Sequence, residues 1–206
     1  MAERPSTAAG SAALVLAGGA ATRMGEPKHA VRLADGRAMI AHVLAALEPL
    51  GLPIHIASER DCPPDLCGLG YPVLQDEQPH EGPLAAVALA LIRLEVDGLL
   101  VVCCDQPLLG PETLRRLLPV YPGDRRPAAF TPADTSDPLP FPGYYPSATL
   151  PAILAELLSG GRSPRRWLAS RECRRIAAGA DEAATLKSFN TRAELAAAGL
   201  LAGDDP

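Results

Sequence analysis

The sequence predicts an α/β protein with a doubly wound, mostly parallel sheet of the Rossmann-like type and helices on both faces. The first observation is that apolar runs of strand length alternate with segments of helical periodicity along the first half of the chain. The second is that residues 98–104 form the most apolar run, as expected for a central strand buried on both faces. Because such sheets bind ligands at the carboxyl ends of their strands, we expect the functional residues at that edge.

The first strand, residues 12–16, opens into a loop with the pattern Gly18-Gly19-x-x-x-Arg23-x-Gly25-x-x-Lys28. Glycine lets backbone N–H groups approach phosphate oxygens, and the two cations can neutralise the remaining charge. The loop is not a P-loop, because His29 follows Lys28 where that motif needs Ser or Thr, and it does not fit G-x-G-x-x-G. Two interpretations stay open: an anion-binding loop, or an ordinary turn with two solvated cations.

The rest of the first half continues the alternation. Helical spacing predicts a crossover helix over residues 39–47 and a second helix over 84–94, with Pro83 in the first turn of the latter. Short strands are predicted at 53–58 and 71–76, separated by a loop rich in Pro and Cys. Strand, helix, strand, helix, strand in this order implies right-handed crossovers and a parallel sheet.

The second half is predicted to mix short helices and strands. The expected helices cover 112–118, 150–158, 164–168 and 192–198, and the expected strands cover 127–131 and 174–177. Residues 132–146 are rich in proline, so we expect irregular or edge structure there rather than a central strand. Residues 189–191 are expected to form a capped turn, residues 1–11 a disordered tail, and residues 12–206 a single domain.

Composition limits the function classes. A net charge of −5 without a basic block argues against a protein that coats nucleic acid or an anionic membrane. No apolar run outside the glycine-loop strand approaches the length of a membrane span, so we expect a soluble protein. The cysteine usage favours the cytoplasm. The five cysteines are an odd number, which argues against a secreted disulfide framework. We therefore expect free thiols throughout and no structural metal at Cys62 and Cys67.

Two carboxylates are predicted at strand ends. Asp105 follows the apolar run at 98–104, and a hard divalent cation can be held there by one carboxylate together with phosphate oxygens and water. The alternative is an aspartate that caps the next helix. Asp76 follows the predicted third strand, and for it ordinary turn chemistry is the alternative.

The run Leu16-Ala17-Gly18-Gly19-x-x-x-Arg23-Met24-Gly25-x-x-Lys28 resembles the signature loop of the MobA-type nucleotidyltransferases, the molybdenum cofactor guanylyltransferases and their relatives. Asp105, between its apolar strand and Pro107, matches the metal-binding aspartate of that family. Residues 82–85 resemble its Gly-Pro-Leu-Ala-Gly segment, with Ala86 in place of the last glycine. Further stretches at 140–145, 161–166 and 189–191 resemble other segments of the family, so the resemblance spans nearly the whole chain.

The resemblance implies a sheet of the nucleotide-diphospho-sugar transferase type, with a nucleotide-binding half (12–110) and an acceptor-binding half (111–206). It implies transfer of GMP from GTP to molybdopterin or its molybdenum form, with release of pyrophosphate and with Mg²⁺ held by Asp105. The implied catalytic residues are Arg23, Lys28 and Asp105. The implied nucleotide-binding residues are Leu16, Ala17, Gly18, Gly19, Lys28, Asp76, Gly82 and Asp105. The implied partners are GTP, the phosphorylated pterin and, transiently, molybdoenzymes or cofactor-handling proteins.

The acceptor end is basic. Six arginines lie within fourteen residues: Arg162, Arg165, Arg166, Arg171, Arg174 and Arg175. A solvated helix face is the usual explanation for such a run, whereas the resemblance implies acceptor-binding roles for Arg162, Arg165, Arg166 and Asn190. The chain departs from the family at Ala57, Leu139 and Ser188, where Asn, His and Asn are common in the guanylyltransferases.

Other functions stay open. One is cytidylyl or other nucleotidyl transfer to a different phosphate, such as a sugar phosphate or phospholactate; the Leu-Ala-Gly-Gly start favours the guanylyl type over it. The other is a non-catalytic nucleotide-binding regulatory protein. The presence of both Lys28 and Asp105 counts against loss of catalysis.

Overall fold

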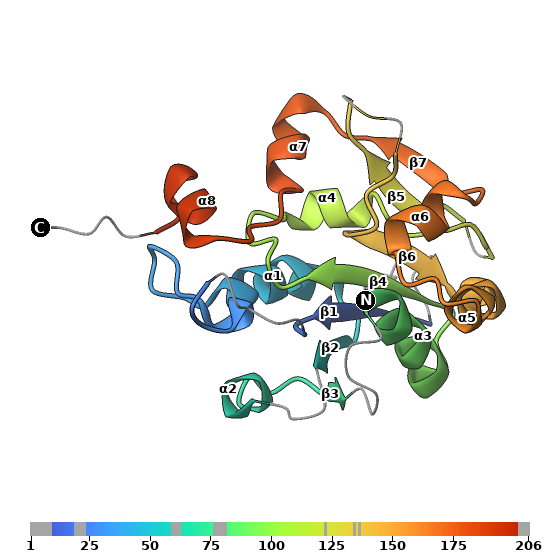
Figure 1. Cartoon of the computed structure of the whole chain (residues 1–206), viewed down its shortest axis with the longest axis horizontal. Coiled ribbons are helices and arrows are strands. Elements are labelled where there is room, and N and C mark those ends of the chain that lie inside the picture. Colours follow the sequence, from blue (N-terminus) through green and yellow to red (C-terminus); the bar gives the residue numbers. More distant parts are fainter. Residues whose placement is uncertain are drawn as a thin grey trace, which may run out of the picture.

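The computed structural model describes residues 10–18, 24–58, 63–75, 82–121, 123–133, 135 and 137–201. These residues form one seven-stranded sheet in the order β3-β2-β1-β4-β6-β5-β7 (Figure 1). The strands are β1 (Ser11–Leu16), β2 (Ile54–Ser58), β3 (Val73–Gln75), β4 (Gly98–Cys103), β5 (Ala128–Thr131), β6 (Gly143–Pro146) and β7 (Arg174–Ala177). The pairs β1–β2, β1–β4, β2–β3 and β5–β7 are parallel, which confirms the mostly parallel α/β fold.

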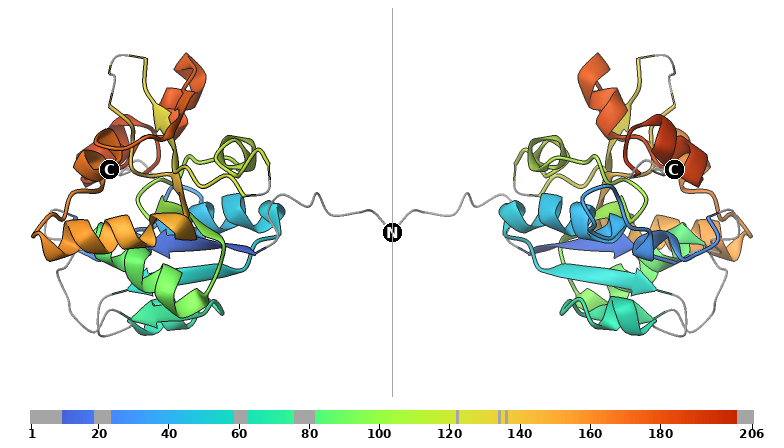
Figure 2. Two further views of the ribbon diagram at one scale, coloured as in Figure 1. Left: turned by 90° about the vertical axis from the view of Figure 1, so that its right-hand side faces the viewer. Right: turned by 90° about the vertical axis from the view of Figure 1, so that its left-hand side faces the viewer.

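Helices cover both faces of the sheet (Figures 1 and 2). They are α1 (Met39–Leu47), α2 (Pro64–Cys67), α3 (Pro83–Leu94), α4 (Pro111–Arg115), α5 (Leu150–Leu158), α6 (Pro164–Ala169), α7 (Ala180–Thr185) and α8 (Arg192–Ala197). Short 3₁₀ turns lie at η1 (Lys28–Ala30), η2 (Glu48–Leu50) and η3 (Ser147–Thr149). The expected helices at 39–47, 84–94, 150–158, 164–168 and 192–198 are confirmed to within about one residue at either end.

The alternation of side chains along β1 shows why two layers form. Ala13 and Val15 pack into a core with α1 and α4, whereas Leu14 and Leu16 pack into a second core with α3, α5 and α6. Since successive strand residues point to opposite faces, an uninterrupted apolar run requires helices on both sides. The sequence 11–16 is such a run, and every residue of β1 is buried.

β6 is the main correction to the sequence-based fold. The proline-rich stretch was expected to be irregular or at an edge, yet β6 pairs antiparallel with both β4 and β5 and so lies inside the sheet. The prediction was wrong because the prolines flank the strand, and only Pro146, its last residue, lies within it. Gly143 is needed at its start, because a Cβ there would lie 2.6 Å from the carbonyl oxygen of Pro140.

Smaller corrections concern local signals. α2 and α7 were not predicted, and α4 ends at Arg115 rather than at residue 118. Cys103, Cys104 and Cys173 are free as expected, but Cys67, at the end of α2, is disulfide-bonded. The expectation of free thiols rested on the odd number of cysteines, which does not exclude a single bridge. Among the described helices, none has the length and apolar character needed to cross a bilayer.

Candidate active site

The carboxyl ends of β1, β2 and β4 meet at one edge of the sheet. Leu16 lies opposite both Ala57 and Cys103 in the strand register. The pairing continues one residue further, where the Ala17 amide donates to the Ala57 carbonyl (2.9 Å) and the Cys104 amide to the Leu16 carbonyl (3.0 Å). Gly18 and Asp105, the residues that follow these pairs, are therefore brought to the same edge, as the sequence predicted.

Lys28 lies at the centre of this edge. Its Nζ donates to Asp105 Oδ2 at 2.7 Å and to Asn190 Oδ1 at 2.7 Å. These partners are 77 and 162 residues away in the sequence, so three distant segments meet at one ammonium group. We call Lys28, Asp105 and Asn190 the site triad. Lys28 and Asp105 were expected in the nucleotide site. Asn190 was expected to bind the acceptor, and its side chain accepts a hydrogen bond from Lys28.

Contacts on both sides of Lys28 fix the segment that carries it. Glu26 pairs with Arg192 at 2.7 Å, which joins the segment to α8. His29 is buried and its Nε2 lies 2.9 Å from Asp65 Oδ2, which joins the segment to α2. Residues on both sides of Lys28 are thus tied to helices, and its ammonium is held at the sheet edge.

Asn190 is positioned by the N-terminus of α8. Thr191 caps this helix, and Glu194 closes a capping box in which its Oε2 accepts from the amides of Asn190 (2.6 Å) and Thr191 (3.1 Å). The pKa of the Glu194 carboxyl is lowered, and the largest cause is the hydrogen bond that it accepts from the Asn190 backbone amide. Next to it, Phe189 is fully buried in a small core with Met24, Val31, Leu33, Met39 and Leu195. The C-terminal segment therefore packs on the segment that carries Lys28.

Asp105 has one oxygen engaged and one open. Oδ2 faces Lys28, and Oδ1 is buried without a hydrogen-bond partner in the part of the chain that the structure describes. A buried carboxylate oxygen without a partner is costly unless a cation or donor completes it. Hard divalent cations take oxygen ligands and accept a single protein carboxylate when a bound nucleotide and water complete the shell. The donor atoms therefore fit a divalent cation held jointly with a substrate.

A clustered metal site is not found among the described residues. The described ranges hold no group of three or more His, Cys, Asp or Glu side chains arranged for a metal ion.

Burial, followed by the charge of Asp105, raises the pKa of the Cys104 thiol to about 12, and the same two causes raise the pKa of the Cys103 thiol well above its usual value. Both thiols stay protonated near neutral pH, so neither is a thiolate nucleophile at this edge.

Gln106 is a site residue that the sequence analysis did not single out. The residue is 1% exposed, and its side chain makes three hydrogen bonds. Oε1 accepts from the Cys103 amide at 3.1 Å, and Nε2 donates to the carbonyls of Phe141 and Leu186, each at 3.1 Å. The available signal was an amide side chain directly after a strand-end carboxylate, in an otherwise apolar neighbourhood.

Gly82 and Arg162 approach each other near the start of α3. Gly82 precedes that helix with φ +84°, a conformation that favours glycine, and a Cβ on it would lie 3.8 Å from the Arg162 carbonyl oxygen. α3 follows the parallel strand β3, so its N-terminus lies at the same sheet edge as the site triad. The segment that begins α6 is therefore close to this edge.

The six arginines differ in their contacts. Arg165 and Arg166 are exposed on α6, and the Arg162 guanidinium donates to the Leu157 carbonyl at 2.7 Å. Arg174 instead donates to the carbonyls of Leu117 (2.7 Å) and Leu118 (2.8 Å), which follow α4, and Arg171 lies over the Trp167 ring. Of the remaining expected site residues, Gly19, Arg23 and Asp76 lie outside the described part of the chain.

Comparisons with known proteins identify the family. The model of the MobA-like NTP transferase domain matches residues 13–176. The molybdenum cofactor guanylyltransferase of Shewanella loihica is 34% identical over 163 residues, which cover 78% of this chain and 82% of the relative. The protein of the same name from Bordetella petrii is 32% identical over 186 residues, which cover 88% and 93%.

Solved structures share the fold. The molybdopterin-guanine dinucleotide biosynthesis protein A of Archaeoglobus fulgidus superposes with a TM-score of 0.71 at 21% identity, covering 91% of this chain and 96% of that one. The 2-C-methyl-D-erythritol 4-phosphate cytidylyltransferase of Thermus thermophilus superposes with a TM-score of 0.65 at 18% identity, covering 91% and 96%. The chain belongs to the MobA-like NTP transferase family.

Proposed function

We propose that this chain transfers GMP from GTP to molybdopterin or its molybdenum form and releases pyrophosphate. The observation that carries the proposal is the site triad, in which a lysine just beyond a glycine-rich loop meets a strand-end aspartate. One oxygen of this aspartate has no partner within the described ranges. The acceptor is proposed because relatives more than 30% identical over most of their length are named molybdenum cofactor guanylyltransferases.

The reaction is a substitution at the α-phosphorus of the nucleotide. A phosphate oxygen of the acceptor forms a new bond to the α-phosphorus, and the bond to the bridging oxygen breaks so that pyrophosphate leaves. The attacking oxygen is already anionic near neutral pH, so the chemistry needs no Ser-His-Asp arrangement. The barrier comes from bringing two polyanions together, and positioning and charge neutralisation lower it.

The site triad supplies this neutralisation. In the proposal, the Lys28 ammonium turns from Asp105 toward the triphosphate, where its positive charge offsets the charge that develops on the leaving group. Asn190 keeps one hydrogen bond to Lys28 and so holds the ammonium at the sheet edge. Arg23 is proposed to add a second cation from the same loop.

Mg²⁺ is the proposed cofactor, held by Asp105 through Oδ1. A bound divalent cation of this kind supplies charge neutralisation at the phosphate oxygens. The backbone of Asp105 is itself fixed, because its carbonyl accepts from the Phe189 amide at 2.9 Å. The position of the Asp105 backbone is therefore set before the nucleotide binds.

The proposed binding residues extend the site on both sides. On the nucleotide side they are Leu16, Ala17, Gly18, Gly19, Asp76 and Gly82. On the acceptor side Arg162, Arg165 and Arg166 are proposed to meet the phosphorylated pterin. The approach of the Arg162 backbone to Gly82, which brings this segment toward the sheet edge, supports that proposal. We place the reaction in the cytoplasm, with transient contacts to molybdoenzymes or cofactor-handling proteins.

Substrate selection tests the proposal. The purified protein is mixed with GTP, CTP, ATP or UTP and with molybdopterin, a sugar phosphate or phospholactate in the presence of Mg²⁺. Pyrophosphate release and the mass of the product are then measured. We expect the dinucleotide product only with GTP and molybdopterin. Turnover with CTP and another acceptor would contradict the guanylyl assignment, and binding of GTP without turnover under any combination would support a regulatory protein instead.

A further inference from the structure

Gln106 joins three segments that all reach the active-site edge. Its Oε1 accepts from the Cys103 amide, which closes the turn that contains Asp105. One Nε2 hydrogen goes to the Phe141 carbonyl, in the loop that leads into β6. The other goes to the Leu186 carbonyl, at the end of α7. Every hydrogen-bonding atom of this buried amide is therefore used, and its bonds leave in three directions.

The bond to Leu186 matters most for the site. Leu186 begins the stretch of five residues that ends at Asn190, and this stretch contacts the turn at Asp105 twice. Gln106 holds the Leu186 carbonyl, and the Phe189 amide donates to the Asp105 carbonyl at 2.9 Å. Asn190 then reaches Lys28, which returns to Asp105. These hydrogen bonds therefore link Gln106, the segment 186–190, Lys28 and Asp105 in a closed loop, in which Gln106 is a buried member.

We propose that Gln106 is a positioning residue that fixes the turn at Asp105 relative to the segment 186–190. The Asp105 carboxylate and the Asn190 side chain then both face Lys28. The inference rests on the proposed function for its catalytic consequence, but the positioning itself is a property of the protein without substrate. Gln106 touches no reacting atom in this account. It acts through the turn at Asp105 and through the backbone that carries Asn190.

A purely structural role predicts a different outcome. In that case Gln106 only satisfies buried carbonyls, and its loss lowers the melting temperature without changing the activity of the folded molecules. Positioning predicts a local loss of order in 186–190 and a changed response to the metal. Residues that orient a metal ligand typically change metal affinity or activity by roughly 10- to 100-fold when they are replaced.

Hydrogen exchange on the substrate-free protein tests the positioning directly. Gln106→Met keeps the length of the side chain and removes all three hydrogen bonds. Tyr145→Phe is the matched control, because the buried Tyr145 hydroxyl donates to the Pro140 carbonyl in the same loop and makes no hydrogen bond to the described residues 186–190. We expect faster exchange of the Phe189 and Asn190 amides in Gln106→Met and parental exchange there in Tyr145→Phe. Should Gln106→Met not fold, Gln106→Asn keeps an amide that is too short to reach Leu186.

Kinetics then tests the catalytic consequence. We expect Gln106→Met to lower kcat roughly tenfold and to raise the Mg²⁺ concentration for half-maximal rate by a similar factor, while Tyr145→Phe stays within about twofold of the parent. Asn190→Ala should cost less in the Gln106→Met background than in the parent, because Asn190 is already displaced there.

The outcomes separate the two proposals. Unchanged exchange at residues 186–190, or equal costs of Asn190→Ala in both backgrounds, would overturn the positioning role. If the parent transfers no nucleotide at all, the proposed function fails, while the exchange measurement still decides whether Gln106 orders the segment.

Discussion

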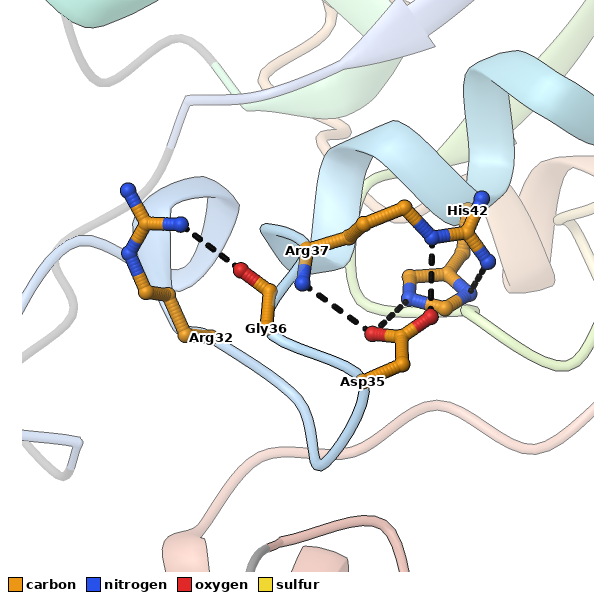
Figure 3. A network of polar contacts seen from close by, with 5 residues as sticks. All are labelled: Arg32, Asp35, Gly36, Arg37 and His42. Atoms are coloured by element: carbon orange, nitrogen blue, oxygen red, sulfur yellow. Dashed lines mark hydrogen bonds and ion pairs between the residues drawn. The ribbon is translucent and has the colours of Figure 1, made fainter.

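Two polar clusters of the molecule differ in one decisive way. The first is the site triad, and the second is the exposed network around Asp35 that precedes α1 (Figure 3). In the network, Asp35 accepts from the Arg37 backbone amide (3.1 Å) and Nε (2.8 Å) and lies 3.2 Å from His42 Nε2. Both Asp35 oxygens therefore have partners within seven residues of sequence. The triad instead joins distant segments and leaves Asp105 Oδ1 without a partner among the described residues.

The comparison teaches how to separate a structural ion pair from a site. A local network that satisfies both of its carboxylate oxygens lowers the pKa of the acid and holds a turn, and exposed pairs of this kind contribute little to stability. The triad instead brings a buried, incompletely satisfied carboxylate together with a lysine and an amide from far along the chain. Such an arrangement is costly to build, and a charged ligand can complete it.

The largest expected effect is at Asp105. Asp105→Asn removes the negative charge and keeps the shape, so the Lys28 contact weakens and the proposed cation loses its ligand. We expect the rate of GMP transfer to fall by about 10²- to 10³-fold. Steady-state pyrophosphate release measures it, and Asp35→Asn is the matched control. A rate for Asp105→Asn equal to that of the control would show that the open oxygen has no catalytic role.

Lys28→Met should follow closely. The variant keeps an unbranched side chain and removes the ammonium, so the triphosphate loses one cation while the fold stays. We expect kcat/KM for GTP to fall by on the order of 10²-fold. Thermal unfolding checks the fold, and a parental kcat/KM would place the triphosphate elsewhere.

The arginines should divide into residues that bind the acceptor and residues that stabilise the fold. Arg165→Ala or Arg166→Ala should raise the KM for the acceptor roughly tenfold, since a charge-assisted contact is worth about 1.5–3 kcal/mol. Arg174→Met should leave that KM unchanged and lower the free energy of unfolding by about 1–3 kcal/mol, because the carbonyls after α4 lose their donor. Chemical denaturation and acceptor titration measure the two quantities. A raised acceptor KM in Arg174→Met would show that Arg174 also contributes to acceptor binding.

The smallest effect is expected at Asp35. Its hydrogen bonds to the Arg37 side chain and backbone lower the pKa of the carboxyl from 3.8 to about 2. Because the folded pKa is below the unfolded one, the pair favours folding above about pH 4, and this contribution disappears as the pH falls through about 2. Carboxyl titration by NMR measures the midpoint, and Arg37→Ala should move it up toward 3.8. An unchanged midpoint would show that Arg37 is not the cause.

The sequence predicted the parts of the site that depend on strand ends. Asp105 and Lys28 each follow a buried apolar strand or its loop, and parallel strands bring their carboxyl ends to one edge, so local patterns were sufficient. The contact of Lys28 with Asn190 has no local signal, because it spans 162 residues and depends on the packing of Phe189. The central place of β6 was missed because proline content describes the flanks of a strand as well as the strand itself.

The metal-binding role of Asp105 can be measured without turnover. Mn²⁺ is titrated into the GTP-loaded parent, Asp105→Asn and Asp35→Asn, and bound metal is followed by electron paramagnetic resonance. We predict that the parent and Asp35→Asn bind Mn²⁺ with the same affinity and that Asp105→Asn binds it at least tenfold more weakly, roughly as expected for loss of a metal-site residue. Equal Mn²⁺ affinity in all three proteins would contradict the assignment of Asp105 Oδ1 as the ligand.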